Sequence, residues 1–319
     1  MNLNNSAFYI LRLLAVKGVG SVKVNTILER ARSYQTNIGE LFLNLKVMEE
    51  LLSSQQLEEL NFGTSLIKEI WDKLQENDTK LLVINEDEYP RRLHSLLGKK
   101  APPILFVLGN HHILNEPSVG FCGSREASDK GLQAAYECAE QLSERGLNIV
   151  SGYAKGVDIT THLAALQTKG MTTLVLPEGI FHFRIKKELE NYWDWNKIAV
   201  VSEFPPRLSW SVRNAMQRNA TICALSQAMI LIESKSTGGS IAAGKTSLKM
   251  QIPLFAADYA GSPDTAEGNR ELVSLGAKPL GRSRKTCKAN IGRVLNAIGY
   301  ENNEINAIET MKFPQLSLF

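Results

Sequence analysis

The sequence predicts an α/β fold in which a doubly wound parallel sheet follows an N-terminal helical segment. From Lys80 onward, short apolar runs of strand length recur, and amphipathic stretches long enough for helices lie between them, as at 126–145 and 157–169. Alternating strands and helices are typical of a parallel sheet with helices on its faces. The runs are continuously apolar, as expected for strands that are buried on both sides. The expected strands are 81–84, 104–108, 119–122, 148–150, 173–176, 198–201 and 229–232.

The segment up to residue 78 has apolar residues at helical spacing and few runs of strand type. Within it, Gly18-Val19-Gly20 separates two helical stretches, a pattern typical of a helix-hairpin-helix (SAM-like) domain. Such a turn can present backbone N–H groups to a DNA phosphate. It can equally be a tight turn without a ligand, in which Gly18 supplies a positive φ. We therefore expect three parts: 1–78, a helical domain; 79–281, the sheet domain; and 282–319, a basic helical extension.

Four glycine-marked loops each follow an apolar run of the expected sheet. They are 121–125, 151–156, 177–179 and 237–240. Because the carboxyl ends of parallel strands meet at one edge of the sheet, we expect these loops to lie together. Free N–H groups at the start of a helix, together with the helix dipole, favour an anion such as phosphate. The loops therefore predict one shared phosphate-binding site.

Basic side chains accompany these loops. Arg125 directly follows Gly123-Ser124, and its guanidinium can donate two hydrogen bonds to a phosphate, although a surface ion pair is the alternative. The stretch 213–219 holds two Arg-Asn pairs, which suit a nucleic-acid backbone or simply a solvated helix start. Phe183 beside Lys186 and Lys187 has the mixture of rings and cations that single-strand binding uses, or else is a core phenylalanine beside a charged face.

Other features limit the chemistry. The four cysteines are scattered, without C-x-x-C spacing or a histidine at ligand spacing, so we expect no metal site. Asp158 and His162 share a helix face, but no nucleophile accompanies them, and we interpret them as a structural pair. No apolar run approaches bilayer length and the first residues do not resemble a signal peptide, so we expect a cytoplasmic protein without a membrane partner. A net charge of +3 permits nucleic-acid binding without arguing for it.

The segment 239–246 matches the phosphate-loop pattern G-x-x-x-x-G-K-T. We discount nucleotide hydrolysis there for two reasons. The loop follows what we take to be the last strand, which leaves little chain for an acidic magnesium ligand. Ala242 and Ala243 also look like the first turn of a helix that begins near Ser240.

Several short motifs occur in one order over about residues 80–280, and together they resemble the DNA-processing protein A (DprA/Smf) family. They are Glu88-Tyr89-Pro90-Arg91-Arg92-Leu93, Pro102-Pro103-Ile104-Leu105-Phe106, Gly123-Ser124-Arg125, Ser151-Gly152 to His162, Ser202-Glu203-Phe204-Pro205, Arg218-Asn219 and Gly239-Ser240-Ile241. Ala220, where the family has a second arginine, and Arg184, where it has a proline, mark a divergent member.

The resemblance implies an extended Rossmann-like domain that binds single-stranded DNA in a basic pocket. It also implies a homodimer that helps to load a RecA-type recombinase. We expect no cofactor. The residues that we expect to bind DNA or its phosphates are Gly123, Ser124, Arg125, Ser151, Gly152, Lys155, Gly156, Phe183, Lys186, Lys187, Arg218, Asn219, Gly238, Gly239 and Ser240.

The C-terminal residues form a second recognisable motif. Gln315-Leu316-Ser317-Leu318-Phe319 matches the Gln-Leu-x-Leu-Phe peptide with which bacterial replication proteins dock on the sliding clamp. In that mode the apolar side chains enter a groove while the glutamine fixes register. The alternatives are a chance match and a tail that folds back on its own domain.

The leading hypothesis is a non-enzymatic single-stranded DNA-binding protein of DNA processing or recombination, recruited to the clamp through its tail. Two alternatives are enzymatic or nucleotide-dependent. One is a nucleoside-monophosphate phosphoribohydrolase of the lysine-decarboxylase-like (LOG) type, whose Pro-Gly-Gly-x-Gly-Thr loop is matched only in part by 237–240. The other is a nucleotide sensor or ATPase that uses Lys245.

Overall fold

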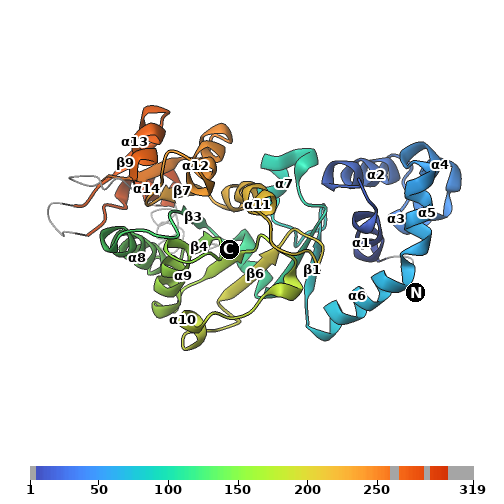
Figure 1. Cartoon of the computed structure of the whole chain (residues 1–319), viewed down its shortest axis with the longest axis horizontal. Helices are drawn as coiled ribbons and strands as arrows, with labels where there is room; N and C mark the ends of the chain where they lie inside the picture. The colour runs from blue at the N-terminus through green and yellow to red at the C-terminus, as the bar shows by residue number, and fades with distance from the viewer. Residues whose placement is uncertain (1–4, 259–265, 284–287, 301–319) are drawn as a thin grey trace, which may run out of the picture.

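The computed structural model of the chain describes residues 5–258, 266–283 and 288–300. The N-terminal helices gather at one end of the molecule, in blue (Figure 1). They are α1 (Ser6–Ala15), α2 (Ser21–Ser33), α3 (Ile38–Leu43), α4 (Leu45–Leu51), α5 (Ser54–Phe62) and α6 (Thr64–Glu76). Their apolar faces share a core that includes Ile10, Leu13, Ile27 and Leu74, all fully buried. This core continues into sheet residues such as Phe106, so the boundary at 78/79 stays a prediction.

The turn between α1 and α2 has the predicted conformation, with Gly18 at φ +77°. Its polar groups are already engaged by α5. The Lys17 backbone N–H donates to Glu59 Oε2 over 2.9 Å, and Gln56 Nε2 donates to the Lys17 carbonyl over 3.2 Å. Because a carboxylate already accepts a hydrogen bond from this turn, the structure favours the tight-turn interpretation over a phosphate site.

Nine strands of the described residues form one sheet, in the order β1-β2-β6-β5-β4-β3-β7-β8-β9. The strands are β1 (Lys80–Val83), β2 (Ile104–Gly109), β3 (Ser118–Cys122), β4 (Asn148–Ser151), β5 (Thr172–Val175), β6 (Ile198–Ser202), β7 (Ala228–Leu231), β8 (Leu254–Ala257) and β9 (Lys278–Leu280). The strands from β3 to β9 pair in parallel, as predicted. The prediction is wrong for β2, which runs antiparallel to β1 and β6, because a uniformly apolar run does not encode strand direction. The prediction also missed β8 and β9.

Both faces of the sheet are covered, as the doubly wound prediction requires. On one face Ile230 and Phe255 share a core with α8 (Asp129–Ser143), α9 (Val157–Gln167) and α14 (Gly292–Ala297). On the other face Met229 and Leu231 share a core with α11 (Val212–Leu225), α12 (Gly239–Lys249) and α13 (Glu267–Ser274). Consecutive residues of β7 thus enter opposite cores, which is the alternation of a strand buried on both sides.

The described part of the predicted C-terminal extension packs on the sheet domain. Val294 and Leu295 of α14 are buried beside α8, and Arg282 pairs with Glu137 of α8 over 2.9 Å. The predicted helix around residues 291–298 is present as α14, whereas the boundary at 281/282 stays a prediction. Within the described residues, no helix combines the length and apolar character that spanning a bilayer requires.

Candidate nucleic-acid interface

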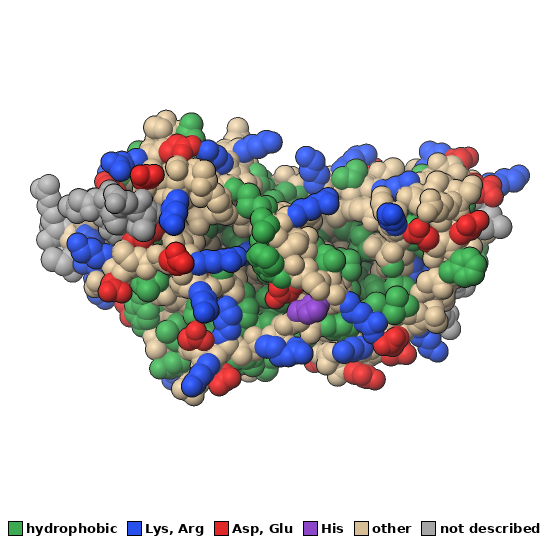
Figure 2. Space-filling view, in the orientation of Figure 1, with side chains coloured by type: hydrophobic (Ala, Val, Ile, Leu, Met, Phe, Trp, Pro, Cys, Tyr) green, Lys and Arg blue, Asp and Glu red, His purple; other side chains and the backbone are tan. Residues whose placement is uncertain are grey.

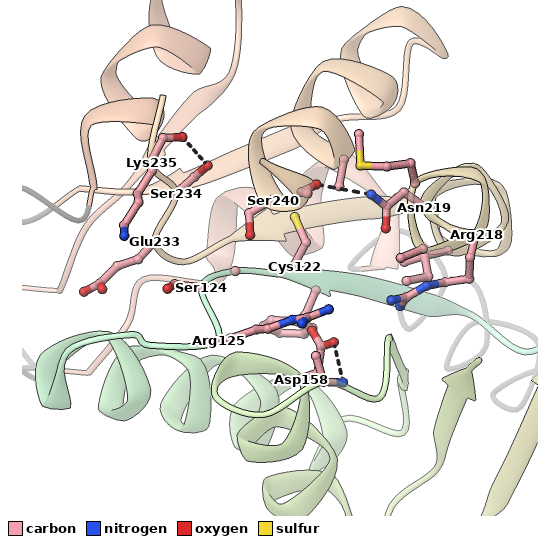
Figure 3. Close-up of a pocket in the computed structure, with 18 of the residues that line it drawn as sticks. Cys122, Ser124, Arg125, Asp158, Arg218, Asn219, Glu233, Ser234, Lys235 and Ser240 are labelled. Carbon is pink, nitrogen blue, oxygen red and sulfur yellow. Dashed lines mark hydrogen bonds between the residues drawn. The ribbon is translucent and has the colours of Figure 1, made fainter. Parts of the chain in front are cut away.

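Loops at the carboxyl ends of β3, β4, β5 and β7 line one groove with two lobes. The first lobe, of about 410 Å³, lies between the 123–126 loop, the segment after β7 and α11 (Figure 3). The second, of about 420 Å³, lies between the 123–126 and 153–155 loops and Pro177-Glu178. Five residues line both lobes, and they include Arg125, Trp210 and Arg218. The glycine-marked loops therefore do meet at one edge of the sheet.

Arg218 lies in the floor of the groove, where α11 brings its guanidinium under the loops. Its side chain is only 7% exposed, and its Nε has no hydrogen-bond partner within the described ranges of the chain. Among the described residues the guanidinium makes no hydrogen bond or ion pair within the usual distance limits. Burial lowers the pKa of Arg218, and the nearby charges of Asp158 and Glu203 partly oppose that effect. A buried cation without a paired anion is costly, so this position suits an anionic ligand.

Gly152 creates the space in which Arg218 lies. A Cβ at this position would be 1.9 Å from Arg218 Nη1 and 2.4 Å from Asp158 Oδ2. Asp158 in turn holds the loop, because its Oδ1 accepts a hydrogen bond from Ser151 Oγ and its Oδ2 accepts one from the Ala154 N–H. Ser151 is fully buried. Ser151 and Gly152 therefore position the site, and the structure gives Ser151 no direct access to a ligand.

Two other expected glycines hold the loops against each other. Gly156 has φ +77°, and a Cβ there would lie 2.5 Å from the Ser124 carbonyl oxygen. Gly123 packs on Val157, whose Cγ2 would be 2.5 Å from an added Cβ. These close approaches fix the 123–125 loop directly over the start of α9, and they leave Ser124 and Arg125 facing the first lobe.

Arg125 and Trp210 form the ridge between the two lobes. The Arg125 guanidinium lies 5.8 Å from the centre of the Trp210 ring, within cation–π range. Trp210 is 48% exposed. Sequence reasoning missed it, although the ring–cation mixture that drew attention to Phe183 also occurs at Trp210 and Arg213. An exposed ring at the centre of a groove is available for stacking.

The start of α12 closes the first lobe. Gly238 precedes the helix with φ +104°, and Gly239 and Ser240 line the groove. Asn219 Nδ2 donates to the Gly239 carbonyl over 3.2 Å, so Asn219 ties α11 to the start of α12. The start of this helix lines the same lobe as Arg125, an arrangement that favours an anion.

The phosphate-loop match is part of α12 and is not a loop. Helix α12 begins at Gly239, so Gly244 and Lys245 lie within it, as we expected from Ala242 and Ala243. Lys245 pairs with Glu271 over 2.7 Å, and a Cβ at Gly244 would meet Leu272. The argument that β7 is the last strand was wrong, since β8 and β9 follow. The helical conformation alone excludes a phosphate cradle at these residues.

The expectation for Phe183 is also wrong, because the ring is in a core. Phe183 is 8% exposed and packs against Tyr153 and Trp193, with ring centres 5.6 and 5.7 Å away. It follows the short 3-10 helix η3 (Ile180–His182) and precedes α10 (Lys187–Glu190). A base cannot reach either of its faces in this structure.

The neighbouring lysines differ in their access to the groove. Lys186 Nζ donates to the Tyr153 carbonyl over 2.6 Å and lies 4.3 Å from the centre of the Tyr153 ring. Burial lowers its pKa. Lys187 is exposed on α10 and lines neither lobe. Lys155 is exposed and lines the second lobe, so it is the lysine of the expected set with direct access.

His162 supports the Gly152 loop from beneath, so its role is structural, but its hydrogen bonds among the described residues go to Gly152 and Thr172 and not to Asp158. Its Nε2 donates to the Gly152 carbonyl over 2.6 Å, and its Nδ1 lies 2.7 Å from Thr172 Oγ1. Burial lowers the pKa of His162 from 6.5 to about 4. The folded protein therefore holds a neutral imidazole over a pH range in which the unfolded chain binds a proton.

This shift makes stability depend on pH. Below pH 6.5 His162 binds a proton in the unfolded chain but stays neutral in the folded protein. The contribution of His162 to the free energy of unfolding is therefore complete above pH 6.5 and is lost between pH 6.5 and 4. The total is about 3 kcal/mol. Urea unfolding at pH 7.5 and 5 should therefore show a smaller pH-dependent loss in His162→Gln than in the unaltered chain. An equal loss in both would contradict a neutral, buried His162.

Comparison with known proteins identifies the family of the chain. Residues 80–290 match the family described as DNA recombination-mediator protein A. The chain belongs to this family. It is 32% identical to DNA processing protein DprA of Streptococcus pneumoniae over 197 residues, which cover 61% of this chain and 68% of that protein. It is 30% identical to protein Smf of Escherichia coli over 220 residues, 68% of this chain and 58% of that protein.

Solved structures extend the likeness to the fold. The X-ray structure of DNA processing protein A from S. pneumoniae superposes with a TM-score of 0.74 at 27% identity, and the match covers 88% of this chain and 95% of that one. DNA processing protein A from Helicobacter pylori, whose structure concerns its single-stranded DNA binding mode, gives a TM-score of 0.56 at 22% identity over 70% and 97%. This second likeness supports a shared fold and no statement about function.

The family consists of recombination mediators that bind DNA and is not an enzyme family. Membership therefore removes the support for the phosphoribohydrolase and ATPase alternatives. The predicted clamp-binding residues, 315–319, lie outside the described residues.

Proposed function

We propose that the groove binds single-stranded DNA through its sugar–phosphate chain and stacks an unpaired base on Trp210. The observation that carries this proposal is the buried Arg218 guanidinium, which lines both lobes and has no anion of the described residues bonded to it. Arg125 and the start of α12 line the first lobe beside it. Together these groups would hold one or two phosphates at the boundary between the lobes.

The distribution of charged side chains favours contact with DNA inside the groove and not over the surrounding surface. Asp158 and Glu233 also line the first lobe, but each accepts hydrogen bonds from the protein, from Ser151 and Ala154 in one case and from Ser128 in the other. Lysine and arginine side chains are spread over the face seen in Figure 2, with acidic side chains between them. This face has no single broad basic patch of the kind that tracks a duplex, so we place binding in the groove.

Trp210 gives the proposal a specific test. We expect Trp210→Ala to weaken binding of a fluorescent oligothymidylate about five- to hundredfold, because stacking of one base on an aromatic ring contributes roughly 1–3 kcal/mol. Trp210→Phe should retain most of the affinity. Trp195→Ala is the matched control, since Trp195 is 42% exposed but lines neither lobe. Equal losses in Trp210→Ala and Trp195→Ala would remove Trp210 from the binding site.

The family description as recombination mediators supports a RecA-type recombinase as protein partner. We also propose a homodimer as the active form, on the basis of the sequence resemblance alone. Light scattering after size exclusion tests self-association, with a mass near twice 35.4 kDa expected.

A pull-down of recombinase on DNA-coated beads, with and without the protein, tests loading. Recombinase capture that does not change when the protein is added would contradict the mediator role.

We also propose that the C-terminal residues dock on the sliding clamp, on the basis of their sequence alone. The test is a pull-down of purified clamp by the full chain and by a chain that ends at Pro314. A third chain with Leu318→Ala and Phe319→Ala keeps the length and removes the two apolar side chains. We expect capture by the full chain only. Equal capture by all three would contradict docking through 315–319.

A further inference from the structure

A cluster of three metal-ligating side chains lies outside the groove. Glu88 belongs to the connection between β1 and α7 (Arg91–Leu97), and His111 and His112 begin the 3-10 helix η2 (His111–Asn115) after β2. One ligand atom from each of the three side chains lies within 4.8 Å of the other two. The DNA-binding proposal makes no use of these residues.

Both segments that carry the cluster are anchored in the fold. Tyr89, next to Glu88, is 3% exposed, and its hydroxyl donates to the Pro102 carbonyl over 2.7 Å. Ile113 and Leu114, next to the histidines, are also buried. The Arg91 N–H donates to Asn115 Oδ1 over 3.3 Å and so joins the two segments. The three donors are therefore held near one another by residues that are not ligands, as a preformed site requires.

The donor atoms also have suitable chemistry and spacing. His111 Nε2 and Glu88 Oε1 lie 3.0 Å apart, and the two imidazole rings lie 4.0 Å apart between centres. Neighbouring ligand atoms on a tetrahedral zinc ion are about 3.3 Å apart, given metal–ligand bonds of about 2.0–2.1 Å. A metal ion in place of the proton between His111 and Glu88 would thus need little movement of these two groups. His112 is exposed and can turn toward the same point.

One cation competes for the cluster. Lys80 Nζ lies 2.9 Å from Glu88 Oε2, the carboxylate oxygen that does not face His111. Both side chains of this ion pair are close to half exposed, and exposed ion pairs contribute little to stability. Because Lys80 occupies one oxygen only, Glu88 Oε1 remains directed toward His111.

We propose that Glu88, His111 and His112 form a binding site for a divalent cation of the zinc class. Two imidazole nitrogens and one carboxylate oxygen are ligands that zinc prefers, and three protein ligands leave a fourth position for water. The bound ion would join the β1–α7 connection to η2. The site is independent of the proposed DNA groove, so a failure of either proposal leaves the other standing.

The test is titration of the metal-free protein with zinc chloride in a competition assay with a chromophoric chelator. We expect one ion per chain, and an affinity at least tenfold lower in each of Glu88→Gln, His111→Ala and His112→Ala, since even the loss of a supporting residue around a metal site costs about tenfold or more. His94→Ala is the control, because His94 is exposed on α7 and does not belong to the cluster. Circular dichroism of each variant verifies folding.

Three results would overturn the proposal. The first is binding too weak to compete with the chelator. The second is an unchanged affinity in Glu88→Gln, which would indicate adventitious binding by the two histidines. The third is an equal loss in His94→Ala, which would indicate unspecific binding to surface histidines.

Discussion

Arg218→Gln is expected to weaken the binding of oligothymidylate by about tenfold or more. The guanidinium is buried in the floor of the groove, and no anion in the described part of the chain is bonded to it. Hydrogen bonds to a charged group contribute about 1.5–3 kcal/mol. The logarithm of affinity against the logarithm of salt concentration should also become less steep, by roughly 0.7 for each phosphate contact that is lost. Fluorescence anisotropy at two salt concentrations measures both quantities.

Arg145→Gln is the matched control for charge. Arg145 is exposed just after α8 and lines neither lobe, and its Nη1 donates to the Gln141 carbonyl of that helix. Arg145→Gln removes the same charge as Arg218→Gln. It should leave the affinity for oligothymidylate within about twofold of the unaltered protein, because a distant exposed charge is screened. If Arg145→Gln weakens binding as much as Arg218→Gln, binding depends on total charge and the pocket assignment fails.

Gly152→Ala is expected to have the second largest effect, through Arg218. A Cβ at 1.9 Å from Arg218 Nη1 forces the guanidinium out of its position, and the same Cβ would lie 2.4 Å from Asp158 Oδ2. We expect oligothymidylate affinity to fall about as far as in Arg218→Gln, together with a loss of about 1–3 kcal/mol in the free energy of unfolding, as overpacking usually causes. Urea unfolding and anisotropy measure the two effects separately.

Gly170→Ala separates loss of stability from loss of the site. An added Cβ there would be 1.9 Å from Ser143 Oγ, a comparable overlap, but Gly170 precedes β5 and so lies at the edge of the sheet opposite the groove. This variant should lose stability and keep its DNA affinity. Normal DNA affinity in Gly152→Ala would show that Arg218 is not needed where the structure places it.

The sequence carried most of the information about the fold, because the relevant signals are local. Apolar runs such as 229–232 identify strands, and glycines at the strand ends identify the loops that form the site. Direction and position in the sheet are not local. The run 104–108 is apolar whichever way it points, so nothing in it revealed the antiparallel β2. The short β9 has too few apolar residues to predict it alone.

The site was harder to predict at the level of single side chains. Arg125 and Arg218 were identified because each stands beside a glycine loop or in a family motif. The roles of Phe183 and Trp210 depend on burial, which their neighbours along the chain do not determine. Phe183 has cations beside it, yet three aromatic rings cover it, whereas Trp210 is exposed on the ridge between the lobes. Only the packing of distant segments distinguishes the two.

The most direct test of the account is to find where an unpaired strand lies on the protein. Ultraviolet cross-linking of a bromodeoxyuridine oligonucleotide, followed by mass spectrometry of the peptides, reports the residues in contact with its bases. Aromatic side chains with exposed rings are the expected acceptors, so we predict cross-links on the peptide that contains Trp210, with lower yield in Trp210→Ala. Cross-links confined to the hairpin at residues 15–21 or to the last residues of the chain would contradict binding in the groove.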